Sequence, residues 1–302
     1  MRYKLYEYKY TYRGNFAYAA QCIEHALDMM GHEKVEDNPD LHVYNHIVRD
    51  LEPDLPENSI IFKPTAPTGK HFTIDRMGYA NSSSITFDEP FEYEFKKVDP
   101  LEVQELQSLI KNKANKWDGS ILLKWKDAKK VRDNHILVLG QMPHDQVVTD
   151  FSFGDHWTKL KQIIEKLKGR DDVVIKLHPR FISEYKTKDI KRTIERWKEE
   201  GHQVFTRYES IHTVLPKTRV AITENSTSGI ECLMHGVPVI SYGYPEYHWV
   251  TKDMRILSRI DNYIDDLSWH DAEMAQKFVH WYIFDHLCSD IDTTMRRLGE
   301  LL

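Results

Sequence analysis

The stretch from residue 219 to residue 243 constrains the fold of this chain more than any other. It opens with Arg219-Val220-Ala221-Ile222, an apolar run typical of a buried strand. Apolar residues then recur at helical spacing, at Ile230, Leu233 and Met234. Gly236 ends that helix, Pro238 follows, and residues 239–240 begin another strand. The stretch therefore predicts a strand–helix–strand unit, which belongs in a parallel sheet.

The turn between the first strand and the helix is crowded with Asn, Ser, Thr and Gly at residues 225–229. Backbone N–H groups at a helix N-terminus can bind a phosphate, and Glu231, just inside the helix, could accept hydrogen bonds from ribose hydroxyls. An ordinary capped helix is equally compatible, because Asn, Ser and Thr are favoured N-caps. This stretch by itself leaves both interpretations open.

The rest of the chain also alternates strands and helices. We expect strands at residues 4–12, 41–44, 59–62, 135–140, 173–177 and 203–205, and helices from about 15 to 31, 101–110, 154–167 and 190–200. A lysine-rich connection at residues 111–132 separates two such series. The pattern predicts an α/β protein with two Rossmann-like α/β/α domains and parallel sheets, residues 1–125 and 126–302. Residues 272–302 are expected to be helical and to pack back across the cleft between the domains.

The amino-acid composition limits the number of domains and the cellular compartment that we expect. The 302 residues are 41% hydrophobic, enough for one large or two modest cores, and their net charge is −6. Cys22, Cys232 and Cys288 are widely spaced and odd in number, so they predict neither a disulfide framework nor a metal site. Without a signal peptide or a membrane-spanning apolar stretch, we expect a cytoplasmic protein.

Polar residues follow three of the predicted strands. They are Gln141, His144 and Asp145, then Lys176, His178 and Arg180, and then the 225–229 turn with Glu231. Ligands of open α/β sheets bind at such strand ends. Cations neutralise phosphate, and a carboxylate beside an anomeric carbon can act as base or nucleophile. Each residue also has a plain structural interpretation: His178 could hydrogen-bond a loop carbonyl, and Asp145 could cap a helix.

Familiar motifs of other enzymes are absent from the sequence. There is no Gly-x-x-x-x-Gly-Lys-Ser/Thr phosphate loop, no His-Glu-x-x-His zinc motif and no Gly-x-Ser-x-Gly elbow. No Asp-x-Asp pair stands at a convincing strand end. We therefore expect no metal site and no tightly bound cofactor.

Four segments in order resemble the capsule polysaccharide synthesis and export proteins that include the bacterial β-Kdo transferases. These are Asp75-Arg76-Met77-Gly78-Tyr79, Val138-Leu139-Gly140-Gln141 with Asp145, Ile175-Lys176-Leu177-His178-Pro179, and Ser228-Gly229-Ile230-Glu231-Cys232-Leu233-Met234-His235-Gly236, followed by Tyr242-Gly243-Tyr244-Pro245-Glu246-Tyr247-His248-Trp249. The resemblance covers about residues 60–253. It implies a GT-B-like fold, in which two Rossmann-like domains face a cleft and the second holds a nucleotide sugar.

The resemblance also implies roles for individual residues. Asp145 and His178 would be catalytic. Donor-binding residues would be Gln141, Lys176, Arg180, Asn225, Ser226, Thr227, Ser228, Gly229, Glu231 and Tyr242. The acceptor would be bound by the first domain, where Arg13, Asn15, Lys63, Asp75 and Arg76 are the candidates.

The function that follows is transfer of a sugar from a nucleotide donor to a glycan, with CMP-Kdo as one candidate donor and with peripheral membrane association compatible with the sequence. An alternative is a phage-type glycosyltransferase acting on hydroxymethylated DNA bases, which the lysine-rich residues 111–132 would suit. A second alternative is a non-catalytic module that only binds nucleotide or glycan. We favour a glycan acceptor, because the motifs outweigh a single lysine-rich segment that has the composition of a solvated linker.

Overall fold

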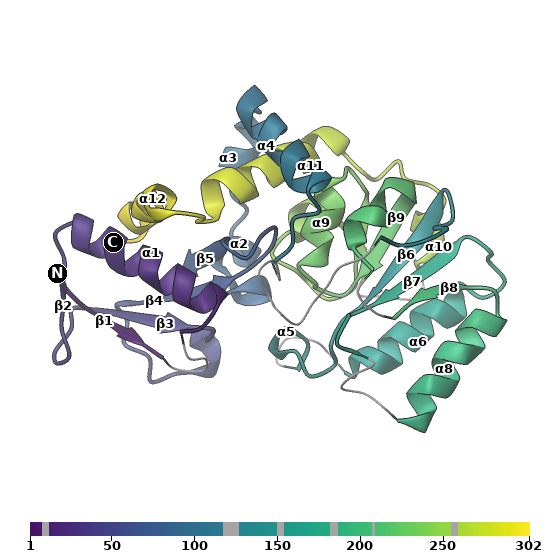
Figure 1. Ribbon diagram of the computed structural model, residues 1–302, viewed down its shortest axis with the longest axis horizontal. Helices are drawn as coiled ribbons and strands as arrows, with labels where there is room; N and C mark the ends of the chain where they lie inside the picture. Colours follow the sequence, from purple (N-terminus) through teal and green to yellow (C-terminus); the bar gives the residue numbers. More distant parts are fainter. Residues whose placement is uncertain (8–11, 117–126, 150–153, 182–186, 207–208, 255–258) are drawn as a thin grey trace. The chain divides into compact units, whose positions relative to one another are not determined.

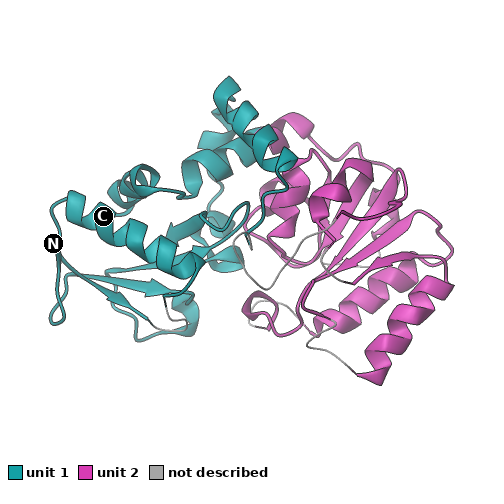
Figure 2. Cartoon of the chain, viewed as in Figure 1, with its two compact units in different colours: residues 1–120, 277–302 teal, residues 121–276 magenta. Residues whose placement is uncertain are grey.

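The structure is a computed structural model that describes residues 1–302 except 8–11, 117–126, 150–153, 182–186, 207–208 and 255–258. The chain divides into two compact units, shown in Figure 2: the first comprises Met1–Ser120 and Lys277–Leu302, and the second Ile121–Gln276. The first break lies close to the boundary expected near residue 125. The last 26 residues belong to the first unit, whereas the sequence analysis assigned them to the second domain.

The first unit contains a five-stranded sheet of order β2-β1-β3-β4-β5. Its strands are β1 (Arg2–Tyr6), β2 (Glu33–Lys34), β3 (Leu41–Asn45), β4 (Ser59–Pro64) and β5 (Phe72–Asp75). The expected parallel pairing is confirmed among β1, β2, β3 and β4. However, β5 pairs antiparallel with β4, as the short connection between them requires, because a parallel return needs a longer crossover. The strand expected at residues 4–12 ends at Tyr6 in the described part of that segment.

One face of this sheet carries the core of the first unit. Tyr3, Val43, Ile60 and Phe62 alternate with residues of the other face and pack with the buried side of α1 (Asn15–Met29). The unit also contains η1 (Arg49–Leu51), η2 (Ala80–Ser82), α2 (Ser84–Phe87), α3 (Glu92–Phe95) and α4 (Pro100–Lys111). The helices expected at residues 15–31 and 101–110 are therefore confirmed.

The C-terminal segment completes the same core. Here α11 (Ala272–His280) runs into a π-helix, Trp281–His286, and a turn leads to α12 (Ile291–Leu301). Cys288 exchanges two backbone hydrogen bonds of 2.9 Å with Phe72 on the edge strand β5. Leu298 of α12 is buried with α1 residues. The tail is thus helical, as expected, but in two helices with a break that covers a sheet edge.

The second unit contains a fully parallel six-stranded sheet of order β11-β10-β9-β6-β7-β8. Figure 1 labels β9, β6, β7 and β8. Its strands are β6 (His135–Gly140), β7 (Val173–Leu177), β8 (Gln203–Phe205), β9 (Thr218–Thr223), β10 (Val239–Ser241) and β11 (Lys252–Asp253). Its helices are α5 (Gln146–Thr149), α6 (His156–Lys166), α8 (Lys188–Glu199), η3 (Ile211–Thr213), η4 (Leu215–Lys217), α9 (Ser228–Met234), η5 (His248–Val250) and α10 (Asp261–Ile264). The predicted strand–helix–strand unit is β9–α9–β10.

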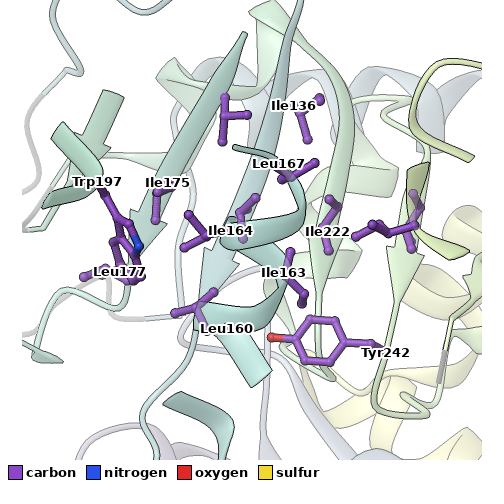
Figure 3. Packing of buried hydrophobic residues seen from close by; sticks show 14 of the residues in the cluster. Ile136, Leu160, Ile163, Ile164, Leu167, Ile175, Leu177, Trp197, Ile222 and Tyr242 are labelled. Atoms are coloured by element: carbon purple, nitrogen blue, oxygen red, sulfur yellow. The ribbon is translucent and has the colours of Figure 1, made fainter. Parts of the chain in front are cut away.

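Alternation along the strands separates the two faces of this sheet. Ile136, Ile175, Leu177 and Ile222 pack against α6 and α8 in one core, which Figure 3 shows from close by. The intervening residues, including Lys176, point to the opposite face because successive side chains of a strand alternate. On that face α9 lies beside β9 and β10. Lys176 is therefore directed toward the side of the sheet that carries α9.

The burial of side chains predicts that two leucine-to-alanine substitutions differ clearly in their effect on stability. Leu160 is 0% exposed and Leu101 is 71% exposed. We expect Leu160→Ala to lower the free energy of unfolding of the second unit by about 2–5 kcal/mol, because it leaves a cavity beneath α6. Leu101→Ala should change stability by no more than about 0.5 kcal/mol. Urea unfolding followed by tryptophan fluorescence measures both, since Trp157 and Trp197 lie in the core that Leu160 fills. Equal effects of the two changes would contradict this packing.

Candidate functional site

The C-terminal ends of β9, β6 and β7 lie side by side, because these strands are neighbours and parallel. The loops that follow them carry the polar residues that the sequence analysis singled out. Asp145 comes after β6, Lys176 and His178 lie at the end of β7, and the turn at residues 225–229 follows β9. The topology thus brings these segments of the second unit to one edge of the sheet, where α/β proteins bind ligands.

Gln141 and Asn225 join two of these loops directly. The Gln141 Nε2 amide donates to Asn225 Oδ1 at 2.9 Å, and the Asn225 backbone N–H donates to Gln141 Oε1 at 3.0 Å. Asn225 Nδ2 also donates to the carbonyl of Val147 at 2.8 Å. Both side chains are buried. These amides hold the loops after β6 and β9 together, and their donor-binding role stays a prediction.

A buried carboxylate beneath the same loops was not predicted. Glu224, directly after β9, is 0% exposed and pairs with both His156 and Lys159 of α6. The Gln141 backbone N–H donates to His156 Nε2 at 2.9 Å, so the ring hydrogen of neutral His156 resides on Nδ1 and is donated to Glu224. In the sequence, the only sign of this ion-paired group is an acidic residue at the end of a strand. Its partners cannot be inferred from the sequence, because they lie 65 or more positions away.

The turn at residues 226–229 is closed by its own hydrogen bonds. The N–H of Ser228 donates to Ser226 Oγ at 3.2 Å, that of Gly229 to the Ser226 carbonyl at 2.9 Å, and that of Ile230 to the Thr227 carbonyl at 3.0 Å. Ser226, Thr227 and Ser228 are half-buried. The turn therefore presents hydroxyl groups, and its contact with phosphate stays a prediction.

Tyr247 packs under this turn and explains why residue 229 is a glycine. Its hydroxyl donates to the Ser226 carbonyl. A Cβ at residue 229 would lie 2.6 Å from Cε2 of the Tyr247 ring, closer than real atoms approach. Burial raises the pKa of the Tyr247 hydroxyl well above its ordinary value, so the hydroxyl remains a donor.

Lys176 and Glu231 form the buried charged part of the site. Burial lowers the pKa of Lys176 to about 8, while Glu231 and Glu209 oppose that shift. Glu231 Oε1 lies 3.9 Å from Nε2 of the buried His212, whose Nδ1 is 2.9 Å from Nε2 of His235. Burial, and next the neighbouring His212, lower the pKa of His235 to about 4, so His235 is neutral at pH 7. Neither histidine was predicted as a site residue.

Other predicted donor-side residues lie at the surface or in the core. Asp145 is exposed, and its Oδ1 accepts from the Val147 N–H at 3.3 Å at the start of α5. His178 is half-buried, and its Nδ1 accepts from the backbone N–H of the exposed Arg180 at 3.3 Å. Tyr242 is 5% exposed and packs in the core with Leu160 and Ile163 (Figure 3). Its ring is part of the hydrophobic interior, and its donor contact stays a prediction.

The acceptor-side residues belong to the first unit. Asp75 is 0% exposed, and its two oxygens accept from Met77, Gly78, Ser83 and Ser84, so this carboxylate folds the turn that follows β5. Lys63 Nζ lies 3.7 Å from the centroid of the Tyr79 ring. Asn15 donates to the Lys116 carbonyl at 2.6 Å, Arg76 to the Leu301 carbonyl, and Arg13 is exposed.

Among the described residues, no group of three or more His, Cys, Asp or Glu side chains is arranged to hold a metal ion. Within the same part of the chain, no helix combines the length and hydrophobicity of a membrane-spanning segment.

The close approach of Tyr247 to Gly229 generates a prediction. Gly229→Ala should destabilise the second unit by about 1–3 kcal/mol, because the added methyl overlaps the Tyr247 ring. Gly299→Ala is the matched control: no atom lies within 4 Å of a Cβ at this position in α12, and alanine favours a helix by about 1 kcal/mol over glycine. Thermal unfolding of both variants measures the difference. A Gly229→Ala protein as stable as the wild type would contradict the packing of Tyr247.

The comparisons with known proteins agree with this fold. The profile of the family described as "Capsule polysaccharide biosynthesis protein" matches residues 70–284. Two solved structures of KpsC from Thermosulfurimonas dismutans are similar to this chain. The β-Kdo 2,4-transferase has a TM-score of 0.60 at 14% identity, with 100% of this chain and 98% of that chain covered. The β-Kdo 2,7-transferase has a TM-score of 0.56 at 12% identity, with 99% of each chain covered.

No curated protein sequence matches this chain. The structural likenesses confirm the expected fold of two Rossmann-like α/β units, of the GT-B-like type. The family match extends over more than half of the chain and includes the loops of the site. The chain therefore belongs to the capsule polysaccharide biosynthesis protein family.

Proposed function

We propose that this protein is a glycosyltransferase that moves a sugar from a nucleotide-sugar donor to a glycan acceptor. The observation that carries the proposal is the buried ammonium of Lys176, which lies at the ligand-binding edge of a sheet in a member of the capsule polysaccharide biosynthesis family. A buried cation is expensive unless negative charge compensates it. We infer that the donor phosphate supplies that negative charge. Glu231 and Glu209 raise the pKa of Lys176, but by less than burial lowers it.

The donor would be bound by three neighbouring loops of the second unit. Lys176 would neutralise phosphate, the hydroxyl groups of the turn at residues 226–228 would hydrogen-bond it, and Glu231 would accept hydrogen bonds from the ribose. His178 and Arg180 lie in the loop that follows β7 and would face the same phosphate. Gln141 and Asn225 hold two of the loops in register, so we assign them to positioning.

Asp145 is the proposed catalytic carboxylate. In the transfer, the bond between the anomeric carbon and the donor phosphate breaks, the nucleotide leaves with that electron pair, and an acceptor hydroxyl bonds to the carbon and loses its proton. A carboxylate can take that proton as general base, or can bond transiently to the carbon as nucleophile. Asp145 is exposed, so its carboxylate is accessible for either role.

The two KpsC structures of the same fold are named as β-Kdo transferases. By analogy we propose CMP-Kdo as the first donor to test and a capsule-type glycan as the acceptor. Lys63, Arg13 and Arg76 of the first unit would contact that acceptor. Such a reaction draws on a cytoplasmic nucleotide sugar, so we propose a cytoplasmic enzyme with peripheral membrane association.

Two substitutions test the proposed catalytic role of Asp145 and the proposed nucleotide-binding role of Glu231. Asp145→Asn preserves an acceptor for the Val147 N–H and should abolish turnover while leaving nucleotide affinity nearly unchanged. Glu231→Gln should instead weaken nucleotide binding by about 1.5–3 kcal/mol, the value of a hydrogen bond to a charged group. Calorimetry with CMP measures binding, and release of free sugar from CMP-Kdo measures turnover.

A wild-type rate in Asp145→Asn would remove Asp145 from the mechanism, and tight CMP binding without hydrolysis or transfer would favour a non-catalytic module.

Lys176 makes nucleotide binding depend on pH. Burial holds its pKa at about 8, so the ammonium loses its proton as pH rises through that value, and affinity for nucleotide phosphate should fall. In the absence of nucleotide, the free energy of unfolding changes with pH in the opposite direction to nucleotide affinity. The folded-state pKa is below the ordinary value of 10.5, so Lys176 contributes a gain in stability between pH 8 and 10.5.

Lys176→Arg provides the control, because arginine stays charged across this range. We expect calorimetric CMP affinity to decline between pH 7 and 9.5 in the wild type and to stay level in Lys176→Arg. A wild-type affinity that does not change over this range would contradict a contact between Lys176 and phosphate.

A further inference from the structure

Three aromatic side chains contact one another in the segment after β10, which includes η5. Tyr244 and His248 have ring centroids 4.2 Å apart at an interplanar angle of 19°, and His248 and Trp249 have centroids 4.1 Å apart at 39°. All three residues are half-buried. We call Tyr244, His248 and Trp249 the aromatic wall. None of the roles assigned so far involves these rings.

The backbone at Tyr244 is held in a conformation that glycine prefers. Its φ is 95°, within the positive range that side chains with a Cβ rarely adopt. Residues kept in such conformations cluster at ligand sites, because the surrounding structure must enforce them. Glycine would relieve the strain but would remove the ring, so the presence of tyrosine here is a second observation that points to a role for the ring.

The loop is anchored to the donor side of the sheet at two points. The Gly243 N–H donates to the Glu224 carbonyl at 3.0 Å, and a Cβ at Gly243 would lie 2.7 Å from Cγ and from the carbonyl oxygen of Glu224. Tyr247, between Tyr244 and His248, donates its hydroxyl to the Ser226 carbonyl. The segment that carries the aromatic wall is therefore fixed to Glu224 and to the turn at residues 226–229, in the same unit of the protein.

We propose that the aromatic wall stacks against the nucleobase of the donor. This inference rests on the proposed function. Lys176, the hydroxyl-rich turn and Glu231 account for phosphate and ribose, which are both polar, and the base is the planar, largely apolar part that remains. Every nucleobase offers a π face, and stacking on aromatic side chains is a general way to hold one. The segment that carries the wall contacts, through Tyr247, the turn that would hold the phosphate.

The test separates the base from the rest of the nucleotide. CMP, UMP, AMP, GMP and ribose 5-phosphate are titrated into the full-length protein, because ribose 5-phosphate keeps the sugar and phosphate but lacks the base. Tyr244→Gly removes the ring at a position whose φ suits glycine, so the fold should be retained, and thermal unfolding checks this. Tyr244→Phe keeps the ring and serves as the matched control.

We expect Tyr244→Gly to weaken binding of the tightest nucleotide about tenfold. Its affinity for ribose 5-phosphate should stay unchanged, and Tyr244→Phe should bind like the wild type. Binding should also alter tryptophan fluorescence, and Trp249→Phe should lose that change while calorimetry still detects the nucleotide.

Three results would overturn the inference. One is an unchanged nucleotide affinity in Tyr244→Gly. Another is an equal loss of affinity for nucleotide and ribose 5-phosphate, which would show a general disturbance of the site. The third is a fluorescence change that persists in Trp249→Phe. In each case a wild type that binds nucleotides leaves the proposed function standing. A wild type that binds none of the four nucleotides overturns both the proposed function and the inference.

Discussion

The buried carboxylate of Glu224 is the interaction on which the ligand-binding edge of the second unit depends. It stands at the first position after β9 and is paired with His156 and Lys159 from α6. A carboxylate with no exposure to water is stable only when such partners compensate it. Its backbone carbonyl also accepts the Gly243 N–H, and His156 accepts the Gln141 N–H. One group thereby anchors the loops after β6, β9 and β10.

Some polar residues at this edge of the sheet hold the loops in place, and others are proposed to face a ligand. The amides of Gln141 and Asn225 bind each other, and Tyr247 supports the turn at residues 226–229. Buried, mutually satisfied polar groups of this kind make a site rigid, which is what precise placement of a reacting sugar requires. We propose that Lys176, Glu231 and the hydroxyl groups of the turn face the donor. Their placement follows from strand alternation and from the position of α9 on the same side of the sheet.

The first unit is organised by the C-terminal segment as much as by its own sheet. The chain leaves this unit near residue 120 and returns at Lys277, and Cys288 then pairs with the antiparallel edge strand β5. The carboxylate of Asp75, at the end of that strand, is saturated by donors from the turn that follows it. A motif that resembles a functional signature in sequence thus has a structural explanation here, and the acceptor contact of Asp75 stays a prediction.

The sequence by itself determined the elements whose periodicity is strong. The strands at residues 135–140, 173–177 and 203–205 match β6, β7 and β8 residue for residue. β6 and β7 are buried parallel strands, which occur in sequence as short apolar runs with sharp ends. The edge that collects Asp145, Lys176 and Glu231 followed from the same pattern, since parallel strands end on one side. Only the tertiary structure decided which polar residues face one another: the Glu224–His156 and Glu231–His212 pairs, the burial of Tyr242 in the core and the return of the last helix to the first unit. Those outcomes depend on contacts between residues far apart in the chain, for which local periodicity carries no signal.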